Sequence, residues 1–348
     1  MVLRFLTLVL LLFSLSANAN AKTYVLKFAT LMPTGTSWTN LLDDWVKEVE
    51  QKSEGRLKFK MYPGGVMGDE PDVLRKIRKG QLHGGMFTGY GIGRIHSPAR
   101  VLEVPFMFQN TDESDYVREQ IMPELEVGFR QSGFELLGWP EVGFIHFFSK
   151  QPITSMDDIR KFKIWLWQGD PLGEAFFKAA AIDPIPLSII DVYTQLSAKH
   201  GSIDTVYISS FGAIALQWYT KLNYASHIAF TNAIGGLVVS NRFYNKLPED
   251  LQQLLKTTGK RLGDDIRMRA REENEKSLAI LQKNGIEFMF DWSDVDMTEM
   301  LEIRDLAAKH LETTNYIPAA TFAKAQKLVT DFRNQQENNS QAATPTSP

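Results

Sequence analysis

Cysteine is absent from the 348-residue chain, and this absence removes several classes of protein from consideration. Disulfide bonds, thiolate metal sites and cysteine-linked lipid anchors are all excluded. Histidine does not compensate, because no two of the six histidines are four residues apart, the spacing that places two imidazoles on one helical face for zinc. They stand at positions 83, 96, 146, 200, 227 and 310. We therefore predict no metal site and no cofactor.

Catalytic motifs are missing as well. The sequence contains neither the Gly-x-Ser-x-Gly elbow of hydrolases nor a Walker loop. The glycine-rich stretch 89–93 lacks the spacing needed to hold a pyrophosphate, so we interpret it as a flexible turn after a strand. Acid pairs such as Asp157-Asp158 lie in helical or turn contexts that suit solubility or capping. We expect no enzyme; catalysis by residues that only the fold brings together is the alternative.

Long apolar runs are scarce, and the main one lies at the N-terminus. Arg4 precedes an apolar run from Phe5 to Leu15, and small residues follow, ending in Ala19-Asn20-Ala21. This order is typical of a cleavable secretory signal peptide, here residues 1–21. An uncleaved membrane anchor is the alternative, but a spanning helix needs about 20 apolar residues and this run is shorter. We predict an exported protein.

The charge balance and length define the remaining chain. Lys and Arg number 38 against 41 Asp and Glu, so loss of Arg4 leaves a net charge of −4, which disfavours a general nucleic-acid role. The 327 residues after the signal peptide suffice for two domains of roughly 100–200 residues. The 22 Phe, 10 Tyr and 7 Trp can build two cores and still supply a binding site.

Strand and helix patterns alternate through the first third of the chain. Residues 24–29 and 55–62 alternate with a period of two, whereas 36–52 and 69–79 repeat apolar residues at helical spacing, and a short apolar strand follows at 86–87. This order predicts a parallel sheet with helices packed on it.

A second α/β unit follows a helix near 112–131. We expect its strands at 134–138, 143–149, 161–167, 184–187 and 203–207, and its helices at 172–181 and 190–198. A further strand at 235–240 is expected to return to the first unit. The predicted division is a first domain of residues 22–145 with about 232–250, and a second of 146–231 with C-terminal helices from about 251 to 333.

One helix is predicted to be long enough to brace both domains. From Pro248 to Lys283 there is no internal proline and a helical apolar stripe persists, which gives about 54 Å if the helix is continuous. Gly259 and Gly263 could instead split it into two shorter helices. Further helices are expected at 294–311 and 318–332, followed by a polar, disordered tail at 334–348. Two α/β domains of this kind can close on a small molecule by hinge motion.

Several motifs, taken in order, carry a family resemblance. They are Phe28-Ala29-Thr30, Tyr62-Pro63-Gly64-Gly65, Glu103-Val104-Pro105-Phe106 and Pro184-Ile185-Pro186-Leu187. Over residues 24 to 332 the chain resembles the DctP-type solute-binding subunits of tripartite ATP-independent periplasmic (TRAP) transporters. The resemblance implies two α/β domains around a ligand cleft, a hinge of crossing strands and a long helix along both domains. It also implies a periplasmic location, a small-molecule ligand and membrane permease subunits as partners.

The sequence departs from the family pattern where the family binds carboxylates. Trp165 stands where the resemblance places the arginine that clamps the substrate carboxylate, and Ile145 stands where many acid-binding members carry an earlier arginine. A bidentate arginine–carboxylate pair is among the strongest hydrogen-bonded contacts, whereas tryptophan offers apolar area and one N–H donor. We therefore predict an apolar or uncharged ligand. The predicted ligand-binding residues are Trp165, Trp167, Ile145, Phe147, Tyr207, Glu70, Tyr90 and Phe211.

Strand alternation places Lys163, Trp165 and Trp167 on one face, opposite Phe162, Ile164 and Leu166. We expect the first set to face the cleft, although in a parallel strand both faces could be buried. Lys163 could then pair with an acid, so a receptor for an organic acid with a different cationic partner is one alternative. A periplasmic carrier or sensor of hydrophobic ligands that works without a TRAP permease is another.

Overall fold

The first lobe is built on a parallel sheet, as the alternating patterns predict. The computed structural model describes residues 22–291 and 297–343, so the predicted signal peptide lies outside the described residues. Strand β1 (Tyr24–Thr30) pairs in parallel with β2 (Leu57–Tyr62) and β3 (Gly84–Thr88). Helices α2 (Ser37–Lys52) and α3 (Glu70–Arg78) connect these strands.

Strand β9 (Tyr224–Ser240) links this lobe to the second one. Its C-terminal part runs antiparallel to β3 and to β4 (Phe134–Gly138), whereas its N-terminal part pairs with β5 (Glu141–Ser149) and β10 (Glu287–Met289). Strand β8 (Thr205–Ser209) extends the sheet beyond β5. The partners of β9 change between residues 234 and 235, so this strand crosses from one lobe to the other, and the sheet order is β2-β1-β3-β9-β5-β8.

The second lobe adds short helices and a small two-stranded sheet. Strand β6 (Trp165–Trp167) pairs in parallel with β7 (Ile185–Leu187). The helices are α6 (Met156–Ile159), α7 (Pro171–Ala179), α8 (Ile189–Ser197), α9 (Ser210–Ala215) and the 3₁₀ turn η2 (Trp218–Lys221). The predicted alternation is confirmed: Trp165 and Trp167 pack into one core cluster, and Ile164 and Leu166 into another. The mixed α/β class predicted from the sequence is therefore confirmed.

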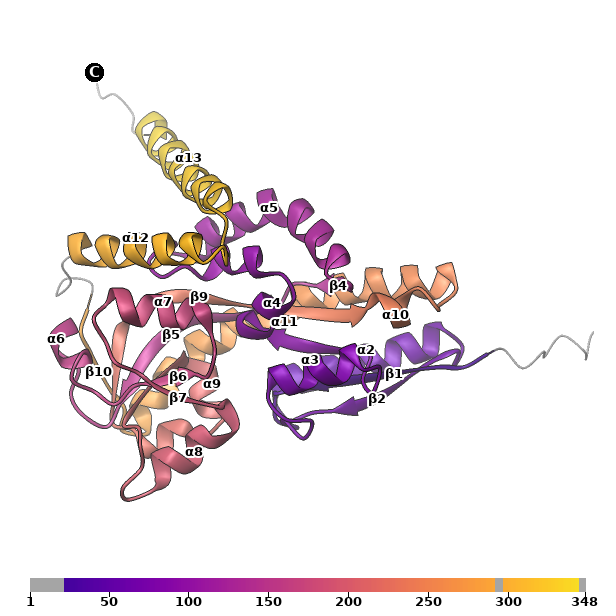
Figure 1. The fold of residues 1–348 in the computed structure, drawn as a ribbon, viewed down its shortest axis with the longest axis horizontal. Coiled ribbons are helices and arrows are strands. Elements are labelled where there is room, and N and C mark those ends of the chain that lie inside the picture. The colour runs from indigo at the N-terminus through magenta and orange to yellow at the C-terminus, as the bar shows by residue number, and fades with distance from the viewer. Residues whose placement is uncertain (1–21, 292–296, 344–348) are drawn as a thin grey trace, which may run out of the picture.

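Helix α11 (Glu249–Lys283) is continuous over 35 residues, which confirms the predicted long helix. It packs against α2 in the first lobe and against α9 and β5 in the second, and Figure 1 shows it passing behind the sheet. Gly259 and Gly263 do not split the helix, because they form its closest approach to β4. A Cβ on Gly263 would lie 2.6 Å from the Trp139 backbone nitrogen.

Two expectations for local structure are wrong. The stretch 89–93 forms the start of helix α4 (Gly89–Ile95) rather than a turn. Its glycines permit close contacts, since a Cβ on Gly91 would lie 2.5 Å from a carboxylate oxygen of Glu70. The tail is also more ordered than predicted, because helix α13 (Ala319–Ala343) continues through residues 334–343. That segment contains no glycine or proline to end the helix; residues 344–348 lie outside the described residues.

The remaining helices cover the first lobe and the outer edge of the second. They are η1 (Ser97–Glu103), α5 (Thr111–Gln131), α10 (Asn241–Tyr244) and α12 (Met297–Thr313). Helix α12 packs against α7 of the second lobe, but α13 packs against α5 and η1 of the first (Figure 1). The C-terminal helices therefore divide between the lobes, where the sequence analysis assigned them all to the second. Within the described residues, no helix combines the length and apolar character needed to cross a bilayer.

Candidate functional site

A cavity of about 460 Å³ lies between the two lobes. The first lobe supplies the loops after β1 and β2, the β3–α4 junction and η1. The second lobe supplies β6, α7, α8, β8, α9 and η2, and strands β5 and β9 complete the wall. The volume falls within the usual range of small-molecule sites. At about 30 Å³ per molecule it holds roughly 15 waters, or a solute of similar size.

Aromatic rings form most of the deep wall on the side of the second lobe. The Trp165 ring stacks on Tyr207 with centroids 5.0 Å apart, and Trp218 meets Trp165 edge-on at 5.3 Å. Phe176 stacks on Phe230 at 5.2 Å. Because each ring packs against another, the rings form one continuous apolar surface.

Six of the eight residues predicted to bind ligand line this cavity. They are Trp165, Trp167, Ile145, Tyr207, Tyr90 and Phe211. Phe147 does not line the cavity. It lies two residues beyond Ile145 on β5, and the Phe230 ring stacks on it with centroids 4.7 Å apart. Lys163, expected to share the face of Trp165, precedes β6 and is exposed to solvent outside the cavity wall.

Trp165 is only 2 % exposed, and its single polar atom is already used. The indole Nε1 donates a hydrogen bond to the Leu187 carbonyl on β7 at 3.0 Å. This N–H, expected from the sequence to be free as a donor, is not available to a ligand, because β7 pairs with β6 and brings the Leu187 carbonyl within reach. Trp165 therefore offers the cavity an apolar ring alone.

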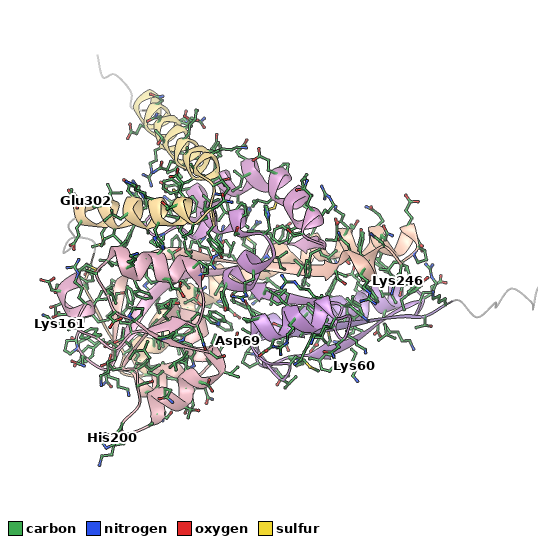
Figure 2. All side chains as sticks on the ribbon, viewed as in Figure 1. Lys60, Asp69, Lys161, His200, Lys246 and Glu302 are labelled. Carbon is green, nitrogen blue, oxygen red and sulfur yellow. The ribbon has the colours of Figure 1, made fainter. Side chains whose placement is uncertain are left out.

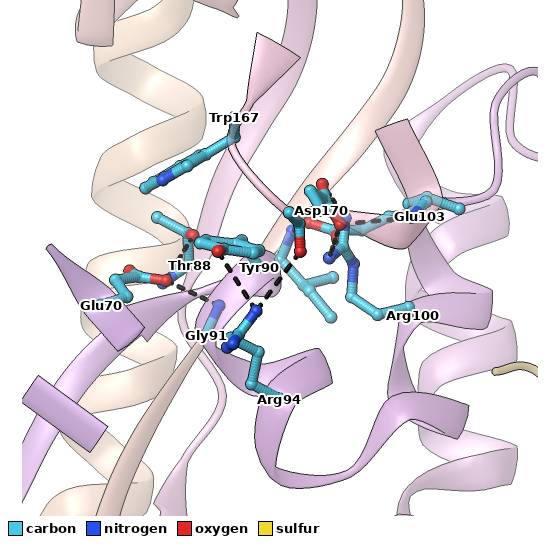
Figure 3. Close-up of polar contacts among 12 residues, drawn as sticks. Glu70, Thr88, Tyr90, Gly91, Arg94, Arg100, Glu103, Trp167 and Asp170 are labelled. Atoms are coloured by element: carbon cyan, nitrogen blue, oxygen red, sulfur yellow. Dashed lines mark hydrogen bonds and ion pairs between the residues drawn. The ribbon is translucent and has the colours of Figure 1, made fainter. Parts of the chain in front are cut away.

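Glu70 is the other predicted residue that does not line the cavity, and it binds the backbone of residues next to the wall. Its carboxylate accepts hydrogen bonds from the backbone nitrogens of Thr88 and Gly91, both at 2.6 Å, and from the Thr88 hydroxyl at 3.0 Å (Figure 3). Burial raises the pKa of Glu70 to about 8, although these hydrogen bonds act in the opposite direction. Glu70 thus fixes the β3–α4 junction, from which Thr88 and Tyr90 reach the cavity.

A buried charged cluster that is absent from the residues predicted to bind ligand lies in the cavity wall. Arg100 on η1 forms two hydrogen bonds to Asp170, which precedes α7, at 2.8 and 3.0 Å. The Arg100 Nε forms an ion pair with Glu103, and Figure 3 shows Arg100 between the two acids. Burial opposes the charge on Arg100, but Asp170 and Glu103 outweigh it and hold its pKa above the usual value.

Only weak sequence signals could have revealed this cluster. Arg100 and Glu103 are three residues apart, which permits a contact within one helical turn. Asp170 directly precedes a proline at the start of a helix, a position that a capping residue explains equally well. The contact between Arg100 and Asp170 joins residues 70 positions apart, and no local pattern encodes it.

Further polar contacts join the lobes at the rim of the cavity. Asp69 of the first lobe accepts hydrogen bonds from Trp167 Nε1 at 3.0 Å, from the Ser188 hydroxyl at 2.5 Å and from the Ile189 backbone nitrogen at 3.3 Å. Figure 2 shows Asp69 between the lobes. The Tyr90 hydroxyl donates to the Gln168 carbonyl at 2.8 Å. These contacts hold the lobes together around the cavity.

One polar group of the wall keeps unused hydrogen-bonding capacity. The Tyr207 hydroxyl accepts a hydrogen bond from the Trp167 backbone nitrogen at 3.3 Å, and within the described residues its own proton has no acceptor. Burial raises the pKa of Tyr207, so the phenol stays protonated and able to donate.

Comparisons with known proteins give a consistent answer. Residues 28–310 match the family model described as bacterial extracellular solute-binding protein, family 7. The chain is 22 % identical over 270 residues to the 2,3-diketo-L-gulonate-binding periplasmic protein of Escherichia coli K12, covering 75 % of this chain and 80 % of that protein. It is 27 % identical over 254 residues to a solute-binding protein of Verminephrobacter eiseniae, covering 70 % and 73 %.

Solved structures show the same fold. A TRAP periplasmic solute-binding protein from Pseudomonas putida F1 with bound D-glucuronate has a TM-score of 0.78 and 23 % identity, and the match covers 88 % of this chain and 97 % of that one. One from Ralstonia eutropha H16 with bound (S)-2-acetolactate has a TM-score of 0.78 and 18 % identity, covering 88 % and 99 %. At these identities, the structural likeness concerns the fold.

Proposed function

Since the chain belongs to the bacterial extracellular solute-binding proteins of family 7, we propose that it is the receptor of a TRAP transporter for an uncharged, largely apolar solute. The family membership confirms the resemblance drawn from the sequence motifs, and members of this family serve transport rather than catalysis. In this proposal the predicted signal peptide delivers the receptor to the periplasm. There the cleft closes on the solute and presents it to membrane permease subunits.

The observation that carries the choice of solute is the composition of the cavity wall. Its rings and aliphatic side chains favour apolar groups, and Trp165 stands where the resemblance places the clamp arginine. Within the described wall, Arg100 is the only cation, and Asp170 and Glu103 already pair with it. The Tyr207 hydroxyl offers one hydrogen bond to a ligand oxygen, so a hydroxyl or carbonyl group on the solute is compatible with the site.

Burial energies favour an apolar solute over an anion. A solute that removes about 300 Å² of apolar surface from water gains about 7 kcal/mol before the entropy cost of association. An anion buried in the same cavity without a free cationic partner loses several kcal/mol through desolvation. The apolar wall therefore supports binding of the first and opposes binding of the second.

A receptor for an organic acid is the second candidate, and Arg100 is the observation that favours it. The E. coli relative is named for 2,3-diketo-L-gulonate, and the P. putida structure contains D-glucuronate; both ligands are acids. In this candidate, the acid would bind Arg100 after displacing Asp170. The acid would then have to compensate for a buried Asp170 that has lost its partner.

The chemical identity of the copurifying solute distinguishes the two candidates. Native mass spectrometry and solvent extraction of the purified mature protein are expected to yield an uncharged compound. A stoichiometric sugar acid or dicarboxylate would overturn the proposed solute class. Uptake of the same compound into vesicles that contain the permease, only when the receptor is added, would distinguish a transport receptor from a free-standing carrier or sensor.

A further inference from the structure

We propose that Asp170 is a built-in counter-ion of Arg100 that excludes acidic solutes from the cleft. The inference rests on the proposed function and deepens it, because it assigns the choice between acids and uncharged solutes to one side chain. In this view the receptor carries its own carboxylate in the place where an acid ligand would meet the arginine.

The geometry of the pair is that of a bound carboxylate. The Arg100 Nη1 and Nη2 atoms contact the two oxygens of Asp170 at 2.8 and 3.0 Å, the parallel two-bond arrangement by which arginine binds acids. Arg100 is 4 % exposed and Asp170 is 5 % exposed, yet both line the cavity. A free acid would therefore compete for the same two donors.

Both partners are held in position by other contacts. The Glu103 carboxylate pairs with the Arg100 Nε and accepts a hydrogen bond from the Ile234 backbone nitrogen at 2.7 Å, so the terminal nitrogens of Arg100 are directed at the second lobe. Asp170 caps helix α7 by accepting a hydrogen bond from the Leu172 backbone nitrogen at 3.2 Å. Neither side chain has to reorient for the pair to form.

Displacement of Asp170 by a ligand is opposed by its burial. Removing one partner of a buried ion pair leaves the other charge without compensation in a poorly solvated site, which is strongly unfavourable. The two side chains come from different lobes, so the pair forms as the lobes meet. Closure is therefore accompanied by neutralisation of Arg100 whether or not the solute carries a charge.

The test replaces Asp170 while preserving the helix cap. Asp170→Ser keeps an N-cap residue but shortens the side chain and removes its charge, and Asp170→Asn keeps the size and the cap. Calorimetry measures the affinity of each variant for benzoate, for its uncharged analogue benzamide and for D-glucuronate. We expect the ratio of benzoate to benzamide affinity to rise at least tenfold in Asp170→Ser over the unmodified protein.

Two controls separate charge from other effects. The double variant Asp170→Ser with Arg100→Met is expected to lose the gained acid affinity, because the freed cation is gone. The variant Asp157→Ser removes the exposed acid of an Asp–Arg pair that does not line the cavity and is expected to leave the ratio unchanged. Circular dichroism and thermal unfolding establish that each variant is folded.

The outcomes distinguish this inference from the proposed function. If folded Asp170→Ser and Asp170→Asn bind neither benzoate nor D-glucuronate better than the unmodified protein, the inference is overturned and the proposed solute class stands. An equal rise for benzoate and benzamide also overturns it, because added space would then explain the gain. Tight binding of D-glucuronate by the unmodified protein would overturn the proposed solute class, and with it the inference that rests on it.

Discussion

Trp165 lines the cavity while remaining almost fully packed among other residues. Its ring lies between Tyr207 and Trp218, and its N–H is bound to the backbone of β7. Trp165 therefore offers a solute only the apolar surface of its ring. Within the protein, the same ring packs the aromatic wall together.

We expect Trp165→Arg to lower affinity for the copurifying solute at least tenfold, about 1.4 kcal/mol. The guanidinium would enter an apolar ring cluster, so the melting temperature should fall as well. Calorimetry with the extracted solute measures the affinity. Trp165→Phe is the matched control, since it keeps an uncharged aromatic ring while losing the bond to Leu187 and part of the ring area, and its affinity should fall less. Unchanged binding by Trp165→Arg would place Trp165 outside the site.

The raised pKa of the buried Glu70 carboxyl sets the sign of a pH dependence of stability. Its pKa is about 8 in the folded protein and near 4.5 when exposed, so the folded state retains a proton that the unfolded state releases between these values. The stabilisation from Glu70 is complete below about pH 4.5 and is lost as the pH rises through about 8. We expect Glu70→Gln to show a shallower fall in melting temperature between pH 5 and 9.

The comparison with Glu70→Gln also removes the influence of other groups. Buried histidines such as His146, whose pKa burial lowers to about 4, change stability in the opposite direction on acidification. Because these groups are identical in both proteins, the difference between the two melting curves reports Glu70. A constant difference across the pH range would contradict the raised pKa.

At the scale of elements, the glycines of α11 show that a predicted helix length does not reveal what the helix packs against. The apolar stripe predicted a long helix, and the structure confirms it. The same sequence left the role of Gly259 and Gly263 open, because their function is the close approach of α11 to β4, a contact between segments more than a hundred residues apart.

We expect Gly263→Ala to destabilise the protein by about 1–3 kcal/mol, the typical range for overpacking. Alanine favours a helix by about 1 kcal/mol over glycine, but its Cβ would lie 2.6 Å from the Trp139 nitrogen and 3.0 Å from the Gly138 Cα. Urea unfolding measures the change. Lys260→Ala, at an exposed position of the same helix, should be nearly neutral. A stabilised Gly263→Ala protein would show that β4 can yield.

Local patterns predicted the elements better than the site. Alternation placed Trp165 and Trp167 on one face of β6, because side-chain direction in a strand follows from the sequence alone. The start of α4 was missed, since three glycines within five residues resemble a turn. Their tight contacts explain them: Gly89 lies against Glu103, Gly91 against Glu70, and Gly93 against Tyr316 and Arg100. The Arg100–Asp170 pair depends on how two lobes meet, which no local pattern contains.

At the scale of the whole molecule, Asp69 connects one lobe with three groups of the other. Its carboxylate caps α3 through the Glu70 backbone nitrogen at 2.7 Å and also binds Trp167, Ser188 and Ile189 across the cleft. A hydrogen bond to a charged group contributes about 1.5–3 kcal/mol, which corresponds to roughly a 10- to 100-fold preference for the closed arrangement.

We expect Asp69→Asn to open the cleft. Asparagine still caps α3, but its amide nitrogen replaces the oxygen that accepts from Ser188 and Ile189, and Trp167 keeps only its longer contact, 3.2 Å, to the other oxygen. Small-angle X-ray scattering of the ligand-free protein should show a larger radius of gyration, and affinity for the copurifying solute should fall. Asp72→Asn, one turn along α3 and paired with Arg75 at the surface, is the matched control. An identical radius for both variants would mean that the aromatic wall and the Arg100–Asp170 pair hold the lobes together without Asp69.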